Sequence, residues 1–554
     1  MELGTVTTMP TAAQHDHYGV LVIGSGPGGA TTAARVAETG QRVLLLERGD
    51  FLPRERDNWN SQVVFGDTKY TADETFYDLH ERPFRPELHY YVGGNSKVYG
   101  AALFRLLPSD FGEVRHPNGA APAWPLNYKD MEPYYVRAEH LFWVHGTHGE
   151  DPFAGFSSQE YEYPPVRHEP RIQQLSDGLG KLGMHPFHLP LGVHLTQDPH
   201  GRATTNSRCI RCDRVDGFPC LVGAKADAEW AVIRPALAAR PNLTLMTRTT
   251  VERLLTDSSG RSVSGVMVTL PDGSPHVFTA DIVVLSAGAI LSAALLLKSA
   301  NDKHPRGLAN SSDMVGRNYM RHNNLALIAF SREPNPTVFQ KTLALNDFYG
   351  PSEHWQFPMG HIQMLGKSDD WQIKAAAPRG LGWAPSASYG EVARHSIDFW
   401  LSSEDIPLAG SRVTLRPDGA IRLALQPGNN TEALTRLRTT FQGMLGKLGM
   451  VDTTFVRSLY LHKAFDAAAT AHQAGTVRFG TDPATSVLDV NCKAHDLDNL
   501  YLADGSFMPS VGAVNPTLTI VANALRVGDH IAERIGATRR PQSGTVPARS
   551  SPTP

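Results

Sequence analysis

The chain has 554 residues, of which 41% are hydrophobic and 19% are charged, and its formal net charge is −3. That is enough apolar material for two or three domains or one large two-lobed enzyme, and the near-neutral charge excludes the basic surface that nucleic acid or an anionic membrane would require. With 4 cysteines, no signal-peptide pattern and no uncharged apolar run of about 18 residues, we expect a cytoplasmic protein with no nucleic-acid or membrane partner.

The first elements along the chain predict a strand–helix–strand unit. Residues 18–24 form a short apolar run that ends in glycine, which is typical of a buried parallel strand. Residues 28–39 have apolar side chains at helical spacing, and residues 42–47 are a second apolar run. An α/β fold with a parallel sheet is the expected result.

A glycine motif, G-x-G-x-x-G, lies directly between the first strand and the helix. Gly24 permits a tight turn, Gly26 lets the backbone approach a pyrophosphate, and Gly29 allows the helix to pack closely on the strand. Glu47 ends the second strand, where its carboxylate would accept hydrogen bonds from the adenosine ribose. The pattern predicts a dinucleotide site, against the alternative of a chance glycine turn, but it does not separate FAD from NAD.

The later elements are of two kinds. Further strands and helices of the α/β part are expected at 242–246, 251–254, 281–287, 288–299 and 517–535. Between residues 325 and 461, aromatic residues, prolines and short alternating runs such as 411–415 and 420–424 indicate a separate lobe with a mostly antiparallel sheet and one or two helices. Residues 541–554 are rich in proline, serine and arginine and are expected to be disordered.

Four further segments carry a more specific pattern. They are residues 91–100 (YVGGNSKVYG), 283–297 (VVLSAGAILSAALLL), 471–480 (AHQAGTVRFG) and 499–520 (NLYLADGSFMPSVGAVNPTLTI). In order and spacing they resemble the flavin-cradling loop, the second signature and the catalytic end of the glucose–methanol–choline (GMC) oxidoreductase family. The resemblance covers residues 15–540, and the C-terminal stretch is most similar to the pyranose oxidase, glycoside oxidase and sugar dehydrogenase branches.

The resemblance implies an α/β fold in which a Rossmann-like FAD-binding domain is interrupted by an α+β substrate domain with an antiparallel sheet. The FAD-binding parts would be residues 15–115, 205–325 and 471–540, and the substrate-binding parts residues 116–204 and 326–470. The change of composition after residue 325 agrees with this division.

The resemblance also implies that the cofactor is FAD, and which residues bind it. Besides Gly24, Gly26, Gly29 and Glu47, these residues are Arg48, Gly93, Gly94, Asn95, Ser96, Val98, Val251, Ala287, Gly288, Asp504, Gly505, Asn515, Pro516 and Thr517. The helix that begins after Pro516 would direct its N-terminus at the flavin and stabilise the negative charge of the reduced ring. Some family members attach FAD to a histidine of the cradling loop, but the corresponding residue here is Val98, so noncovalent binding is expected.

Alcohol oxidation by a flavin needs a base for the hydroxyl proton and an open face for hydride transfer. His472 matches the family's catalytic histidine and is the expected base. Asn515 matches the partner position, and it would hydrogen-bond the substrate oxygen as in the choline, cholesterol and pyranose oxidase arrangement. From the residues alone, a buried structural histidine and a simple helix cap are the alternatives.

Cys209, Cys212 and Cys220 lie close together in the sequence, and three such thiols can bind zinc or an iron–sulfur cluster. Their spacing differs from that of the three-cysteine cluster in the family's sugar dehydrogenases, and the sequence nearby offers no evident fourth zinc ligand. A loop with inert thiols or one disulfide, and no metal, is expected instead. His361 and His462 are expected to be structural or to belong to the substrate lobe, with no assigned role.

The predicted function is FAD-dependent oxidation of a secondary alcohol of a sugar or glycoside to the ketone, at C2 or C3 as in pyranose and C-glycoside oxidases. Electrons would pass to oxygen or a quinone. The alternatives are an FAD enzyme acting on a nonsugar alcohol or secondary-metabolite intermediate, a non-catalytic flavin-binding redox sensor, and an NAD-dependent dehydrogenase. The presence of both His472 and Asn515 argues against the redox sensor. The loop at 93–100 has no function in an NAD-dependent dehydrogenase, which argues against that alternative.

Overall fold

The N-terminal apolar run forms an inner strand of a seven-stranded sheet in the computed structural model, which describes residues 16–377, 386–457 and 471–536. The strand order is β10-β2-β1-β13-β12-β11, and β21 also pairs with β13. The strands are β1 (His17–Ile23), β2 (Val43–Leu46), β10 (Leu243–Met246), β11 (Thr250–Thr256), β12 (Val263–Thr269), β13 (Pro275–Leu285) and β21 (Leu500–Leu502).

The centre of this sheet is parallel, as the sequence predicts. β1 pairs in parallel with both β2 and β13, so that Val22 lies between Leu45 and Val284. All three side chains are buried, which is the usual state of strands in a parallel sheet because both of its faces are covered. β11 and β12 extend the sheet as antiparallel strands.

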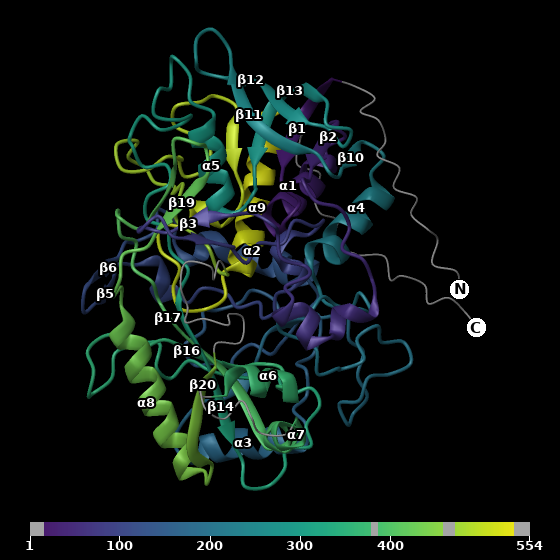
Figure 1. Cartoon of the computed structure of the whole chain (residues 1–554), viewed down its shortest axis with the longest axis vertical. Coiled ribbons are helices and arrows are strands. Elements are labelled where there is room, and N and C mark those ends of the chain that lie inside the picture. The colour runs from purple at the N-terminus through teal and green to yellow at the C-terminus, as the bar shows by residue number, and fades with distance from the viewer. Residues whose placement is uncertain (1–15, 378–385, 458–470, 537–554) are drawn as a thin grey trace.

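Three helices follow strands of this sheet and begin beside the same edge. They are α1 (Pro27–Ala37), α5 (Ala289–Lys298) and α9 (Thr517–Arg534). α1 and α9 lie side by side (Figure 1), and an ion pair joins them, with Arg35 Nε 2.5 Å from Asp529 Oδ1. The short helix α4 (Arg234–Ala239) packs against β10.

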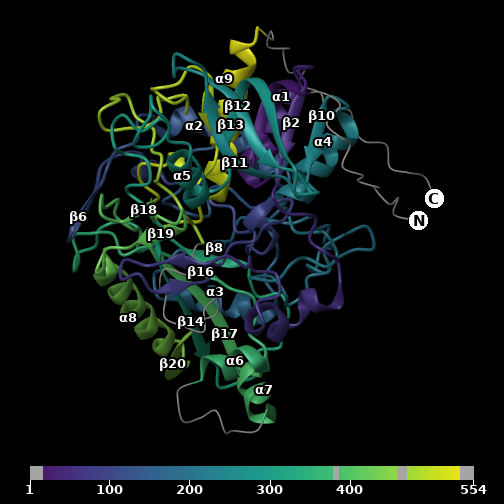
Figure 2. The same cartoon turned by 45° about the horizontal axis from the view of Figure 1, so that its top comes forward.

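A second sheet of six strands, in the order β20-β14-β17-β16-β15-β8, lies in the lower half of the view in Figure 1. All of its pairings are antiparallel. Its strands are β8 (Phe187–His188), β14 (Asn323–Phe330), β15 (Leu343–Leu345), β16 (His361–Met364), β17 (Ser396–Ser403) and β20 (Val451–Arg457). Around it lie α3 (Pro170–Lys181), α6 (Asp370–Ala376), α7 (Ser386–Arg394) and α8 (Thr431–Lys447), as Figure 2 also shows.

The antiparallel lobe differs in two details from the expectation. Its described part after residue 325 contains three helices, α6, α7 and α8, instead of one or two. The runs at 411–415 and 420–424 do form strands, β18 (Arg412–Leu415) and β19 (Ile421–Ala424), but these do not join the six-stranded sheet. They form a separate four-stranded sheet, in the order β18-β19-β3-β4, with β3 (Phe76–Tyr77) and β4 (Pro83–Phe84). Alternation along a strand predicts its buried face but not its partner.

The helix α2 (Tyr128–Leu141) lies in the stretch assigned above to the substrate domain, yet it packs on α9. Tyr135 Oη and Thr519 Oγ1, one from each helix, are 2.9 Å apart. The domain boundaries themselves stay a prediction. The remaining strands form two short antiparallel pairs, β5 (Val114–His116) with β6 (Gly119–Ala121) and β7 (Val144–His145) with β9 (Leu191–Gly192).

None of the helices in the described ranges is long and apolar enough to cross a bilayer. The segment expected to be disordered, residues 541–554, lies outside those ranges.

Candidate active site

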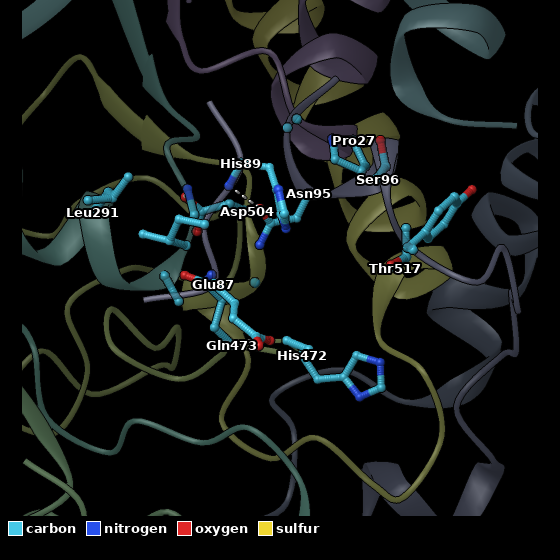
Figure 3. Close-up of a pocket in the computed structure, with 18 of the residues that line it drawn as sticks. Pro27, Glu87, His89, Asn95, Ser96, Leu291, His472, Gln473, Asp504 and Thr517 are labelled. Atoms are coloured by element: carbon cyan, nitrogen blue, oxygen red, sulfur yellow. Dashed lines mark hydrogen bonds between the residues drawn. The ribbon is translucent and has the colours of Figure 1, made fainter. Parts of the chain in front are cut away.

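A cavity of about 780 Å³ lies between the two sheets. On one side its wall consists of the carboxyl ends of β1, β2 and β13 together with the beginnings of α1, α5 and α9. On the other side it is lined by residues of β14, β16 and β17. Figure 3 shows Pro27 of α1 and Thr517 of α9 toward one side of the view and Leu291 of α5 toward the other. The cavity therefore joins the dinucleotide turn to the antiparallel lobe.

The glycine motif shapes the wall beside α1. Gly24 has a φ of +98°, in the left-handed region that favours glycine, and a Cβ on Gly29 would lie 2.0 Å from the carbonyl oxygen of Gly24. Gly26 differs, because a Cβ there would meet no atom within 4 Å. The space beside Gly26 is thus open at the N-terminus of α1, where free N–H groups and the helix dipole favour an anion. These residues fit the pyrophosphate of a dinucleotide.

Glu47 binds the turn to the cradling loop. Its Oε2 accepts hydrogen bonds from Ser25 N (3.1 Å) and Ser25 Oγ (2.5 Å), and its Oε1 accepts one from Gly49 N (2.8 Å). Ser25 Oγ in turn accepts a hydrogen bond from Gly93 N at 3.1 Å. Burial raises the pKa of Glu47. Its carboxylate also lines the cavity, so a ribose hydroxyl would meet a group that its neighbours already hold in place.

The cradling loop at 91–100 is held from behind by a buried ion triplet. Lys97 is 5% exposed, and its Nζ lies 2.9 Å from Asp227 Oδ2 and 2.5 Å from Glu229 Oε2. Val98, the next residue, lines the cavity. The loop contains no histidine. His89, just before it, also lines the cavity, but its Nδ1 bonds to the Tyr70 carbonyl at 2.8 Å.

Asp504 joins the end of β21 to the beginning of α5. Its Oδ2 accepts hydrogen bonds from Gly288 N (2.9 Å) and Ser292 Oγ (2.5 Å), and its Oδ1 accepts one from Ser506 N (2.9 Å). Burial raises the pKa of this carboxyl. Asp504 therefore fixes Gly288, which has a φ of +89°, at the edge of the cavity.

The structure brings nearly all of the predicted cofactor residues to this one cavity. Gly29 and Gly93 lie behind its wall and support the turn and the loop. The predicted residues that line it are Gly24, Gly26, Glu47, Arg48, Gly94, Asn95, Ser96, Val98, Val251, Ala287, Gly288, Asp504, Gly505, Asn515, Pro516 and Thr517, together with His472.

His472 and Asn515 meet at the end of the cavity that faces the antiparallel sheet. Asn515 Nδ2 lies 3.2 Å from His472 Nε2, and Figure 3 shows the imidazole directed away from Gln473. The side chain of Asn515 does not cap α9, whose N-cap is Pro516. Burial, and then the nearness of His322 and other basic groups, holds the pKa of His472 well below its usual value. At neutral pH the imidazole is therefore uncharged and able to accept a proton.

Three residues beside His472 and Asn515 were not identified from the sequence. His322 Nδ1 lies 3.0 Å from His472 Nδ1, Gln363 Nε2 donates to Asn515 Oδ1 at 2.9 Å, and the Trp400 ring centre lies 6.5 Å from that of His472. His322 stands among 23 histidines, and no local motif marks it. Gln363 and Trp400 occupy β16 and β17 as ordinary strand residues, so only the tertiary fold identifies them. His361, expected to be structural, is buried and bonds to Asn346 at 2.7 Å; His462 lies outside the described residues.

The cysteine cluster is not arranged as a metal site. Cys209 is buried, which raises its pKa to about 12, and Cys220 Sγ accepts a hydrogen bond from Ala224 N at 3.3 Å. In the part of the chain that the structure describes, the four cysteines are free and no group of three or more His, Cys, Asp or Glu side chains is placed to hold a metal ion.

Family models agree with the features of the cavity. Two models described as GMC oxidoreductase match residues 91–324 and 411–524, and one described as an NAD(P)-binding Rossmann-like domain matches residues 22–55. Among solved structures, pyridoxine 4-oxidase from Mesorbium loti superposes with a TM-score of 0.63 at 20% identity over 92% of this chain and 98% of that one. A formate oxidase superposes with a TM-score of 0.62 at 16% identity over 94% and 99%.

Similar proteins of known activity span nearly the whole chain. The chain is 31% identical to 6'''-hydroxyparomomycin C oxidase of Streptomyces lividus, over 94% of this chain and 92% of that protein. It is 29% identical to paromamine 6'-oxidase of Streptomyces fradiae, over 93% and 91%. It is 28% identical to 2-methyl-1,2-propanediol dehydrogenase of Mycolicibacterium austroafricanum, over 95% and 97%.

The open space at Gly26 leads to a test of the dinucleotide turn. In Gly26→Val the side chain enters space that the pyrophosphate needs, so the purified protein should contain little or no FAD, while its melting temperature should match that of wild-type protein stripped of FAD. Absorbance of the flavin against protein concentration measures the loading. Gly443→Val on α8, where a Cβ also meets no atom within 4 Å, is the matched control and should load normally. Full FAD content in Gly26→Val would show that the turn is wrongly assigned.

Proposed function

Since the chain belongs to the GMC oxidoreductase family of flavoenzymes that act on CH–OH groups, we propose that it oxidises a hydroxyl group of a sugar or glycoside. FAD, when bound, supplies the hydride acceptor for this chemistry. The secondary hydroxyl at C2 or C3 of a pyranose is the position that the sequence favours. The relatives of this chain include two oxidases whose names give aminoglycosides as their substrates, which supports a glycoside over a simple alcohol.

A buried hydrogen-bond acceptor without a donor lies beside His472 and Asn515. Gln363 is 2% exposed, and its Nε2 is used by Asn515, but its Oε1 has no hydrogen-bond partner among the described residues. A buried carbonyl oxygen without a donor destabilises a protein by about 1–3 kcal/mol. A second hydroxyl on the substrate would supply that donor. A monohydric alcohol has no such group, so the site favours a polyhydroxylated molecule.

A charged pair adds to the polar character of the same wall. Lys341 and Asp216 form a buried ion pair, and both line the cavity. Asp216 Oδ2 is also held by Gly366 N at 2.7 Å. Asn324, nearby in the lining, accepts a hydrogen bond from Trp400 Nε1 at 3.1 Å. Hydroxyl groups of a sugar can donate to and accept from such groups, whereas a hydrocarbon chain would leave them desolvated.

His472 and Asn515 would have different roles toward the substrate hydroxyl. His472 Nε2 carries a lone pair at neutral pH and would take the hydroxyl proton. The Asn515 Nδ2–H that bonds His472 Nε2 in this structure would instead donate to the same substrate oxygen, as the C–H bond of the carbon that carries that oxygen is broken. Because Asn515 cannot itself act as a base, the proton has one destination.

The cradling loop bears on how FAD is attached, and the relatives bear on the electron acceptor and the substrate. Val98 occupies the position at which other members carry a linking histidine, so we propose that FAD is bound noncovalently. The electron acceptor is oxygen or a quinone; the relatives bear the names of both oxidases and dehydrogenases. Oxidation of a nonsugar alcohol is the second candidate, because one relative is a 2-methyl-1,2-propanediol dehydrogenase.

Removal of the base should stop proton transfer without affecting the cofactor. His472→Ala should slow flavin reduction by an alcohol roughly 10²–10⁴-fold, which is the usual contribution of a positioned base. FAD content should stay normal, since the turn at Gly26 is unchanged. Stopped-flow absorbance at the flavin band measures the rate. Reduction at the wild-type rate would remove His472 from its proposed role.

The proposed noncovalent binding can be tested by acid. Precipitation of the holoenzyme in acid should release all of the flavin into the supernatant, because Val98 offers no nitrogen for a histidyl link. The absorbance of pellet and supernatant is compared. Colour retained by the pellet would reveal a covalent attachment elsewhere.

The substrate class can be tested with a panel of alcohols and one variant. Paromamine, D-glucose, D-fructose, pyridoxine, 2-methyl-1,2-propanediol and 1-butanol are compared as reductants, with oxygen and a soluble quinone as acceptors, and the products are examined for ketone or aldehyde. The sugars and paromamine should give the highest kcat/KM. Gln363→Leu should lower kcat/KM for the best of them about 5- to 150-fold, the equivalent of about 1–3 kcal/mol, and should affect 1-butanol less. A preference for 1-butanol, or equal losses for both, would contradict a sugar substrate.

A further inference from the structure

His322 is a buried residue that the proposed reaction does not yet use. It lies just before β14, is 3% exposed, and touches His472. Both histidines have a positive φ, +63° at His322 and +57° at His472. A non-glycine residue in this region destabilises the fold by about 1–3 kcal/mol and persists where the surroundings impose it. Two such residues in contact indicate that the relative placement of their rings is specified by the fold.

The direction of each hydrogen bond at this site follows from one backbone carbonyl. The oxygen of Val511 can only accept, and His322 Nε2 lies 3.2 Å from it, so Nε2 carries the proton. A neutral His322 then has a lone pair on Nδ1. His472 Nδ1, 3.0 Å away, must donate to that lone pair. The remaining nitrogen of a neutral His472, Nε2, is therefore without a proton, and it accepts from Asn515 Nδ2 at 3.2 Å.

We propose that His322 is a positioning residue that fixes the tautomer of His472, so that the unprotonated Nε2 of His472 faces the substrate. This inference rests on the proposed function, in which His472 is the base. Once a substrate oxygen replaces Nε2 as the acceptor of the Asn515 N–H, an imidazole whose Nδ1 had no acceptor could place its proton on either nitrogen, and the Nε2–H form cannot take a proton from the substrate. His322 removes that form. It acts through His472 and need not touch the substrate.

The charge of His322 matters as much as its geometry. Burial lowers the pKa of His322, so it is a neutral acceptor at neutral pH. A carboxylate in the same place would favour the imidazolium form of His472 and would protonate the base. The other titratable groups near this pair are Glu404, toward His322, and Lys341 and His361, toward His472. None of these three replaces the acceptor at His472 Nδ1.

The contact to Val511 also ties the base to its partner. Asn515 follows four residues later in the same segment, whose N–H groups are bound by Glu404 Oε1 at Gly512 (3.0 Å) and by Tyr349 Oη at Ala513 (2.7 Å). His322 therefore contacts His472 with one nitrogen and the segment that carries Asn515 with the other. His322 therefore determines which nitrogen of His472 carries the proton, and it also helps to fix the distance between His472 and Asn515.

Two variants of the FAD-loaded enzyme test the proposal. His322→Phe keeps a ring but has no acceptor, whereas the side-chain oxygen of His322→Asn can accept near the position of Nδ1. His361→Phe is the matched control: His361 is also buried and packs edge-on against Phe104, with ring centres 4.6 Å apart, but its Nδ1 bonds to Asn346 and not to His472. FAD content and melting temperature are recorded for each protein.

The first measurement needs no substrate. In ¹⁵N-histidine-labelled enzyme, with the signals of His472 identified by their loss in His472→Gln, wild type should show a protonated Nδ1 and an unprotonated Nε2 at neutral pH. His322→Phe should populate the Nε2–H form, and His322→Asn and His361→Phe should keep the wild-type pattern. A protonated Nε2 in wild type, or an unchanged pattern in His322→Phe, would overturn the proposal.

The second measurement is flavin reduction by the best alcohol of the panel, as a function of pH. His322→Phe should lower the limiting rate about 10- to 100-fold, by comparison with the loss typical of removing the hydrogen-bond partner that orients a metal-binding imidazole, with KM changed less than about threefold. Measuring the rate across pH separates a change in this limiting rate from a change in the protonation of His472. His322→Asn should recover most of the rate. If His472→Ala is slow but His322→Phe is not, only this inference fails; if His472→Ala is fast, the proposed function fails with it.

Discussion

The segment 511–515 is held by hydrogen bonds to residues that belong to, or flank, the antiparallel lobe, and the arrangement of the reactive end depends on these bonds. His322 donates to the Val511 carbonyl, Glu404 accepts from Gly512, and Tyr349 accepts from Ala513. Gly512 has a φ of +59°, and a Cβ there would lie 2.6 Å from Tyr349 Oη, so the approach requires glycine. Because α9 begins directly after this segment, the same bonds set where its N-terminus lies. The two sheets are thereby fixed relative to each other at the point where the chemistry is proposed.

At its other end the cavity depends on close approaches of backbone. A Cβ on Gly28 would lie 1.6 Å from the Ala503 carbonyl oxygen, and one on Gly94 would lie 3.2 Å from the Gly26 Cα. The turn can approach the end of β21 only because Gly28 lacks a side chain, and a Cβ on Gly94 would crowd the contact between the turn and the cradling loop. Glu47 links the end of β2 to the turn, and Asp504 links the end of β21 to the beginning of α5. A dinucleotide would thus meet a surface assembled from four distant parts of the chain, with little freedom to adjust.

The sequence predicted the parts of the site that short patterns encode. The parallel strands, the glycine turn, Glu47, His472 and Asn515 each belong to a segment whose own residues carry the signal, and the fold places them at one cavity. His322 and Gln363 carry no such signal, because their partners lie 150 and 152 residues away in the chain. The pairing of β19 with β3 was missed for the same reason. Local periodicity specifies which face of a strand is buried, whereas its neighbours depend on the whole topology.

A crystal structure of the FAD-loaded enzyme would test most directly the claim that these segments form one site with His472 and Asn515 at its reactive end. We expect the pyrophosphate in the open space beside Gly26, at the N-terminus of α1, and the flavin ring against Val98 with His472 Nε2 and Asn515 Nδ2 on one of its faces. A pyrophosphate bound away from Gly26, or a flavin ring out of contact with His472, would contradict it.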